Sequence, residues 1–153
     1  MLSKLLVAWA LMGGCVAIHA AGVAAAVRRF GDQAGAPSRF WASTGIFVRL
    51  AGWIVLLHLL EIAGWALFYL LRHALPDFAS ALYFSAVTYT TTGYGDVVLP
   101  PEWRLVGAVE ALTGILMCGW STGFFVAAVS RALRAEVSSD PSALPGDARR
   151  SDH

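Results

Sequence analysis

Three long apolar segments constrain this chain more than any other feature of its sequence. They lie at 5–27, 44–71 and 105–130, and each is long enough to span a bilayer, which takes about 20 apolar residues. The 153 residues are 58% hydrophobic and only 14% charged, which is the composition of a membrane protein rather than of a soluble domain. The net charge of +1 gives no sign of a nucleic-acid partner.

Basic residues gather beside these segments and indicate an orientation. They are Arg28, Arg29, Arg39 and Arg49 after the first segment, and Arg131 and Arg134 after the last. Basic ends of membrane segments favour the cytoplasm. The sequence therefore predicts a multi-pass protein of the plasma (inner) membrane, with its N-terminus outside and its C-terminus cytoplasmic.

The first segment has an alternative reading as a signal peptide cleaved within residues 1–21. Lys4 would be its positive end, and Ala20-Ala21 would be a small-residue cleavage site. The apolar run is longer than a usual signal core of about 7–15 residues. We therefore expect a retained helix.

A seven-residue motif, Thr90-Thr91-Thr92-Gly93-Tyr94-Gly95-Asp96, lies between the last two apolar segments. Glycine adopts unusual backbone angles without steric cost, and rings of backbone carbonyls can replace the water shell of a cation. Irregular backbone at membrane depth is tolerated where protein buries it or where it lines a cavity. The alternative is a glycine-rich turn in an ordinary loop, which the flanking short amphipathic run and long apolar segments argue against.

In residue types, order and context, this motif resembles the selectivity filter of potassium channels. Residues 45–131 resemble the two-helix pore domain of bacterial potassium channels, with an extra N-terminal transmembrane helix. The resemblance implies an all-α membrane protein: a tetrameric potassium-channel pore domain with a re-entrant pore helix and a filter loop. The motif occurs once, so a fourfold pore needs four chains, and we expect a homotetramer surrounded by membrane lipid.

The expected division of the chain follows from the apolar segments, from the polar composition of the C-terminal residues and, for the pore domain, from this resemblance. It comprises an extra N-terminal transmembrane helix (1–28), a cytoplasmic connector (29–43), a pore domain (44–134) and a disordered cytoplasmic tail (135–153). Within the pore domain we expect an outer helix at 44–71, a pore helix at 77–89, the filter at 90–96 and an inner helix at 104–134. Pro76 and Asp77 are typical of a helix start.

The resemblance also implies the ion site. Its members are Thr91, Thr92, Gly93, Tyr94 and Gly95, which would offer oxygens, mostly backbone carbonyls, to a transported K+ ion. Asp96, Tyr83 and Thr90 would support the filter, with Tyr83 placed to donate its hydroxyl to Asp96. Thr92 departs from the family, which usually has valine or isoleucine there, and its hydroxyl needs a partner to keep the filter rigid.

The last apolar segment carries the residues expected at the cavity and gate. Ile115, Cys118 and Thr122 would face the cavity, and Val126 would lie near the inner constriction. Gly114 is where the family often has a hinge glycine, and close helix packing is the equal alternative.

Ionisable side chains inside the apolar segments form a second candidate site. His58 and Glu61 share one helix face, and Glu110 is a possible partner from the last segment. A polar cluster behind the filter and separately hydrogen-bonded carboxyls both stay open. His19 is expected to be a packed, neutral histidine, and Cys15 and Cys118 to be free thiols.

The function predicted from the sequence is a passive, potassium-selective ion channel. A weakly selective cation channel and a non-conducting membrane scaffold or regulatory subunit with a pore-like fold are the alternatives. An enzyme is not expected, because no spacing indicates a nucleophile with its base and no metal-ligand cluster is recognisable. No repeated arginines indicate a voltage sensor.

Overall fold

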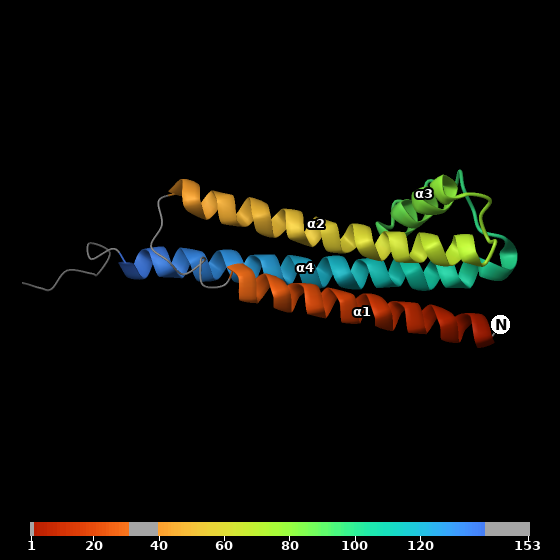
Figure 1. Ribbon diagram of the computed structural model, residues 1–153, viewed down its shortest axis with the longest axis horizontal. Helices are drawn as coiled ribbons and strands as arrows, with labels where there is room; N and C mark the ends of the chain where they lie inside the picture. The colour runs from red at the N-terminus through yellow and green to blue at the C-terminus, as the bar shows by residue number, and fades with distance from the viewer. Residues whose placement is uncertain (1, 31–39, 140–153) are drawn as a thin grey trace, which may run out of the picture.

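The computed structural model describes residues 2–30 and 40–139 (Figure 1). Its helices are α1 (Leu2–Phe30), α2 (Phe40–Leu71), α3 (Phe78–Tyr89) and α4 (Arg104–Ser139), with a short 3₁₀ turn, η2 (Pro101–Trp103), before α4. No strand occurs in these residues. Spans of α1, α2 and η2–α4 at 2–29, 44–71 and 101–134 are long and apolar enough to cross a membrane, so this is a multi-pass membrane protein.

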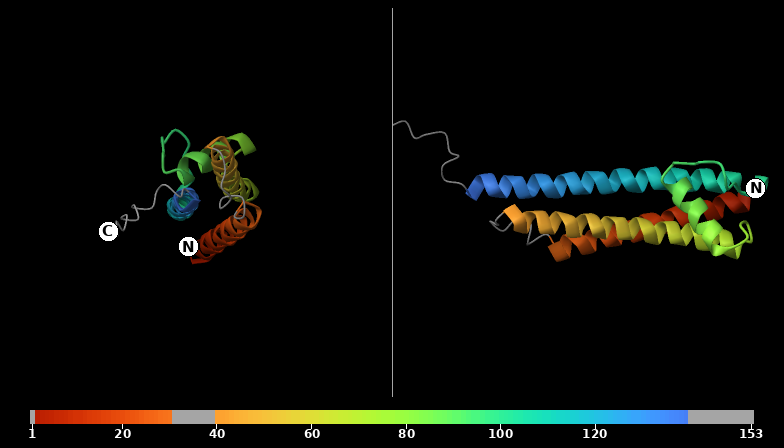
Figure 2. Two further views of the ribbon diagram at one scale, coloured as in Figure 1. Left: turned by 90° about the vertical axis from the view of Figure 1, so that its left-hand side faces the viewer. Right: turned by 90° about the horizontal axis from the view of Figure 1, so that it is seen from above.

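The long helices lie side by side, and α1 and α4 run opposite to α2 (Figures 1 and 2). α1 packs against both α2 and α4 of its own chain. The indole N–H of Trp53 donates to the Gly22 carbonyl at 2.9 Å, and Lys4 lies 4.0 Å from the centre of the Trp103 ring. These contacts, near the two ends of α1, join it to the rest of the chain.

The helix bounds extend beyond the expected ones. Residues 40–43 belong to α2 rather than to the connector, and residues 135–139 belong to α4 rather than to the tail. Neither stretch contains glycine or proline, so nothing local stops helix propagation from the neighbouring span. The remainder of the expected tail, 140–153, and connector residues 31–39 lie outside the described residues.

The short helix α3 packs against α2 and α4 on the side away from α1 (Figure 2). Asp77 caps its start, because its carboxylate accepts from the Ser80 N–H at 2.9 Å and from the Ser80 hydroxyl at 2.8 Å. Aromatic residues fill the space between α3 and α2, where the rings of Tyr69 and Phe84 are 5.4 Å apart. This core holds α3 at a fixed angle to the long helices.

Gly114 of α4 is buried against the C-terminal end of α3. A β-carbon at this position would overlap the carbonyl group of Tyr89. The obstacle is backbone, so it cannot move aside as a side-chain tip would. The structure therefore gives Gly114 the packing role that was one of its two expected roles.

We predict that Gly114→Ala pushes α3 away from α4. Overpacking of this kind typically costs about 1–3 kcal/mol. The loss should appear as a lower midpoint of thermal unfolding in detergent, followed by circular dichroism. Gly119→Ala is the matched control, because Gly119 lies on the same helix and an added β-carbon there meets nothing within 4 Å. Equal midpoints for the two variants would contradict the packing role.

Candidate functional site

The backbone that follows α3 has an unusual alternation of conformation. Thr91, Gly93 and Gly95 have φ angles of 60°, 52° and 78°, whereas Thr92 and Tyr94 between them have no positive φ. Glycine takes such angles freely, but a β-branched residue such as Thr91 rarely does. Strain of this kind is concentrated at functional sites, which makes this loop the leading candidate.

Backbone hydrogen bonds attach the loop to the last turn of α3. The donors are the N–H groups of Thr90, Thr91 and Gly93, which reach the carbonyls of Ala86 (3.1 Å), Thr88 (2.9 Å) and Val87 (3.0 Å). The last carbonyls of a helix have no partner within the helix. The loop supplies partners to these carbonyls and is in turn held close to the helix end.

The hydroxyl of Thr92 also has a partner. Thr90 donates its hydroxyl to the Ala86 carbonyl at 2.7 Å, and its oxygen lies 3.0 Å from the Thr92 hydroxyl oxygen. Since the Thr90 proton is already used, Thr92 is the donor in the second bond. The departure at Thr92 is therefore accommodated within the loop.

Asp96, at the end of the loop, accepts a hydrogen bond from Tyr83 of α3 at 2.7 Å. This is the contact expected from the family resemblance. The hydroxyl stabilises the charged form, so the pKa of Asp96 is held below its usual value. The bond spans from α3 to the far end of the loop, and it closes the loop over the helix.

The residues expected at the cavity and gate lie on α4. Ile115, Cys118, Thr122 and Val126 are exposed in the single chain, at a spacing that places them on one face of the helix. Thr122 donates its hydroxyl to the Cys118 carbonyl at 2.9 Å. Residues 90–96 of the loop are exposed as well. The chain thus presents two uncovered regions, one irregular backbone and one helical.

A buried polar ring joins all four helices. Its members are His19 of α1, His58 and Glu61 of α2, Tyr89 of α3 and Ser121 of α4. The His19 Nδ1 lies 2.9 Å from a Glu61 oxygen, and the His58 Nδ1 lies 3.1 Å from the Tyr89 hydroxyl. Ser121 Oγ is 2.9 Å and 3.1 Å from the Nε2 atoms of the two histidines. Tyr89 donates to the second Glu61 oxygen and so closes the ring.

The ring contains two members of the expected polar cluster, His58 and Glu61, but not the third. Glu110 accepts a hydrogen bond from Tyr69 at 2.9 Å instead. Tyr69 follows Glu61 by two turns of α2, which is about 12 Å along the axis, so the two carboxyls lie at different depths. Of the two alternatives left open, the contacts therefore support carboxyls that are hydrogen-bonded separately, and Glu110 is not a partner of Glu61.

The sequence did not predict that His19, Tyr89 and Ser121 belong to a polar cluster. His19 carried a signal, since an ionisable group in a membrane segment is a candidate by default. Tyr89 and Ser121 carried none, because other hydroxyl-bearing residues stand close to both in the sequence. The packing of α1, α3 and α4 against α2 brings these groups together.

A family model described as ion channel matches residues 55–131, which is half of the chain. The chain belongs to this ion-channel family. The matched stretch contains most of α2, all of α3, the loop and most of α4, whereas α1 lies outside it. No curated protein and no solved structure matches the chain. Members of an ion-channel family are generally not enzymes, in agreement with the sequence-based expectation.

We predict that Tyr83→Phe in this ion-channel protein raises the pKa of Asp96 toward its usual value, because the Tyr83 hydroxyl that favours the carboxylate is lost. In the unaltered protein the bond is complete at neutral pH and is lost as the pH falls through the lowered pKa. Carbon-detected NMR titration of the aspartates measures the change. Asp77 is the internal control, because bonds from Ser80 hold its pKa low. Equal shifts at both aspartates, or none, would contradict the assignment.

A double-mutant cycle tests the separation of the two buried carboxyls. Glu61→Gln and Glu110→Gln share no partner, so their effects on the free energy of unfolding should add within about 0.5 kcal/mol. Glu61→Gln and His19→Gln remove opposite sides of one contact, so their effects should deviate from additivity by more than that. Denaturant unfolding in mixed micelles provides the measurement, and coupling between the two glutamates would restore the single-cluster hypothesis.

Proposed function

We propose that this ion-channel protein is a passive, potassium-selective channel formed by four copies of the chain. In this proposal α3 is the pore helix, residues 90–96 form the selectivity filter, and the carbonyls of Thr91, Thr92, Gly93 and Tyr94 coordinate dehydrated K+, with Gly95 completing the loop. The observation that carries the proposal is the alternation of φ at residues 91, 93 and 95. Left-handed residues alternating with ordinary ones can turn successive peptide groups the same way, and backbone carbonyls that face one path can coordinate a dehydrated cation.

Exposure of the loop supports assembly. Irregular backbone within a membrane needs burial in protein or contact with a water-filled path. In one chain residues 90–96 have neither cover nor a closed path around them. Four copies around an axis provide both, and the exposed α4 face with Ile115, Cys118, Thr122 and Val126 would then line the cavity below.

The hydrogen bond between Thr92 and Thr90 favours strict selectivity over weak selectivity. A threonine in place of the usual valine would loosen the filter if its hydroxyl lacked a partner behind the loop. Here that hydroxyl is bonded, and the neighbouring N–H of Gly93 is bonded to α3. Asp96 and Tyr83 support the outer end of the loop in the same way.

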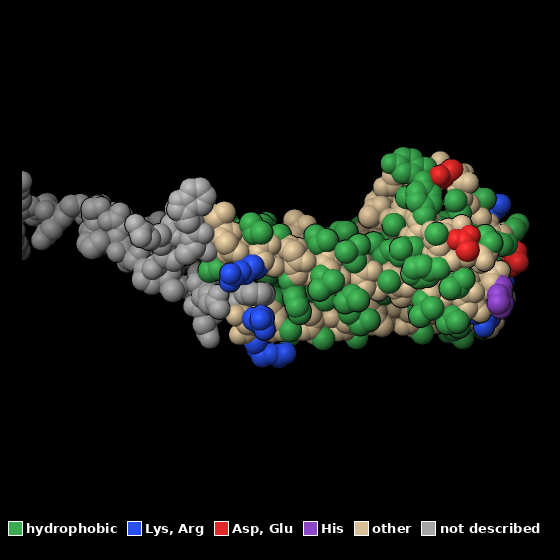
Figure 3. Space-filling view, turned by 45° about the horizontal axis from the view of Figure 1, so that its top comes forward, with side chains coloured by type: hydrophobic (Ala, Val, Ile, Leu, Met, Phe, Trp, Pro, Cys, Tyr) green, Lys and Arg blue, Asp and Glu red, His purple; other side chains and the backbone are tan. Residues whose placement is uncertain are grey.

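The distribution of charge supports the proposed orientation. In Figure 3, the larger group of Lys and Arg side chains lies at the left end of the described part. The acidic side chains on this face lie at the other end, together with smaller patches of Lys and Arg. The left end contains the C-terminal ends of α1 and α4 and the start of α2 (Figure 1). By the positive-inside tendency, this end is cytoplasmic in the plasma (inner) membrane and the N-terminus is outside.

Potassium flux into liposomes that contain the purified protein, with sodium as the competing ion, tests the proposal. We expect potassium-selective flux that Gly93→Ala reduces about tenfold or more, because alanine at a left-handed position costs about 1–2 kcal/mol in each chain. Gly52→Ala is the matched control, since Gly52 has no neighbour within 4 Å and no positive φ.

Other outcomes would favour the alternatives. Equal sodium and potassium flux would identify a weakly selective cation channel and direct attention to Thr92. No flux over a range of pH and voltage would favour a non-conducting scaffold or regulatory subunit.

A further inference from the structure

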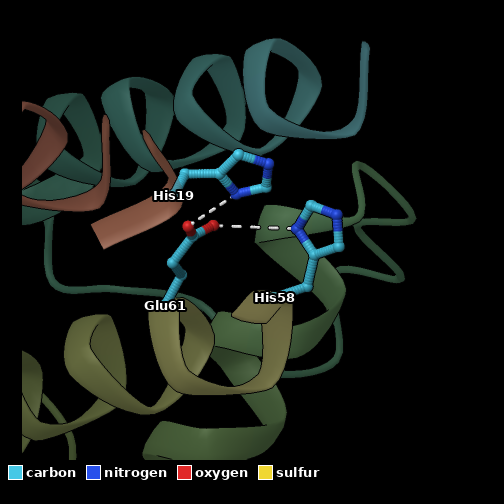
Figure 4. A group of neighbouring side chains, drawn as sticks. All are labelled: His19, His58 and Glu61. Carbon is cyan, nitrogen blue, oxygen red and sulfur yellow. Dashed lines mark hydrogen bonds and ion pairs between the residues drawn. The ribbon is translucent and has the colours of Figure 1, made fainter. Parts of the chain in front are cut away.

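Two imidazoles and one carboxylate converge between α1 and α2. Figure 4 shows His19 and His58 pointing at Glu61, and one ligand atom from each residue lies within 4.8 Å of the others. The side chains of His19 and Glu61 are fully buried, and that of His58 is 16% exposed. We propose that these three residues bind one divalent transition-metal ion of the zinc class.

The donor set and spacing suit such an ion. Zinc takes imidazole nitrogen and carboxylate oxygen at about 2.0–2.2 Å, so neighbouring ligands of a tetrahedral site lie about 3.3 Å apart. The Nδ1 atoms of His19 and His58 are 2.9 Å and 3.7 Å from the two oxygens of Glu61. Because all three ligand atoms lie within 4.8 Å of one another, the side chains must draw closer to one point to bind a single ion. A harder ion such as Mg²⁺ prefers an all-oxygen set and fits less well.

Ser121 provides the support that metal-binding histidines require. Such histidines donate the proton on their other ring nitrogen to a fixed acceptor, which sets the orientation of the ring. Ser121 Oγ lies 2.9 Å and 3.1 Å from the two Nε2 atoms. A hydroxyl oxygen has two lone pairs, so this one atom can accept from both imidazoles while their Nδ1 atoms bind the metal.

When Glu61 is ionised and no metal is bound, the ring has one proton too few for its contacts. It contains five close polar contacts. With Glu61 ionised and both imidazoles neutral, each imidazole and each hydroxyl supplies one proton, which makes four protons for five contacts whatever the tautomers. An unpaired carboxylate in a membrane is costly. A divalent metal ion compensates the charge of Glu61 and leaves a net charge of +1 at the site. It also removes the proton deficit, because it replaces the hydrogen bonds at the two Nδ1 atoms.

A mostly apolar cavity lies beside the site, between α1 and α2. It has a volume of about 320 Å³ and is lined by Glu61, Cys15 and Trp65, among others. Occupancy would fasten α1 to α2. It would also act on Tyr89, which contacts both His58 and Glu61 and directly precedes the candidate filter. This last effect rests on the proposed channel function, whereas metal binding itself does not.

Cobalt titration of the metal-free protein in detergent tests the site, because Co²⁺ in a four-coordinate site has a distinctive visible spectrum that zinc then abolishes. We expect one ion per chain, confirmed by elemental analysis for zinc. Ser121→Ala should weaken binding about 10–100-fold, as loss of an outer-shell partner does, and His19→Gln should weaken it further. Zinc should raise the unfolding temperature of the unaltered protein but not that of His19→Gln.

His73→Asn is the matched control. His73 is an exposed histidine between α2 and α3, and asparagine tolerates its positive φ. Its affinity should not change. Binding of less than one ion per chain by the unaltered protein would overturn the proposal. So would His19→Gln and Ser121→Ala variants that bind the ion as tightly as the unaltered protein does. An unfolding temperature that changes with acid but not with metal would also overturn it, because a proton rather than a metal ion would then supply the missing contact in the ring.

Flux measurements separate this proposal from the channel function. If the protein conducts potassium, zinc should alter the flux of the unaltered protein and leave that of His19→Gln unchanged. A protein that binds one zinc ion per chain but conducts no potassium refutes the channel proposal and leaves the metal site intact. A protein that conducts potassium selectively but binds no metal refutes the metal site and leaves the channel proposal intact.

Discussion

Backbone polar groups inside a membrane have no water to bond to, and this constraint shapes the whole end of the molecule around α3. The last carbonyls of α3 are satisfied by N–H groups of the loop that follows it. That arrangement is possible only because the loop turns back over the helix end, with left-handed residues at Thr91, Gly93 and Gly95. Gly114 then lets α4 approach the carbonyl of Tyr89. The conformation of the loop and the packing of α4 against α3 thus depend on each other.

The same constraint applies to the two buried carboxyls: within the described residues, both oxygens of Glu61 have partners, whereas only one oxygen of Glu110 has one. Glu110 sits near the end of the molecule that carries α3, in contact with the hydroxyl of Tyr69. Glu61 lies deeper and contacts groups from α1, α2 and α3. One of these groups, His19, comes from α1, which lies outside the stretch that matches the ion-channel family. The extra helix is therefore an integral part of the bundle, since without it a buried carboxylate would lose a partner.

Much of this organisation was predictable from the sequence, because it depends on local features. Length and apolarity indicated the membrane segments, Pro76 and Asp77 indicated the start of α3, and the family resemblance implied the hydrogen bond between Tyr83 and Asp96. The polar ring was not predictable, because it depends on how each helix is rotated about its axis. His58 and Glu61 share a face whatever that rotation, but whether His19, Ser121 or Glu110 meets that face is decided by packing among distant segments. The left-handed angle at Thr91 was missed for a similar reason, since a β-branched residue gives no local signal for it.

The position of α1 bears on how copies of the chain would assemble. α1 packs against α2 and α4, yet the loop at 90–96 and the α4 face with Ile115, Cys118, Thr122 and Val126 stay exposed. The extra helix therefore covers neither of the regions that the proposed pore needs. Tyr89 belongs to the polar ring and directly precedes the loop. A change in the packing of α1 against α2 would therefore affect the loop through the side chain of Tyr89. In the proposed channel, α1 would act on conduction from outside the pore.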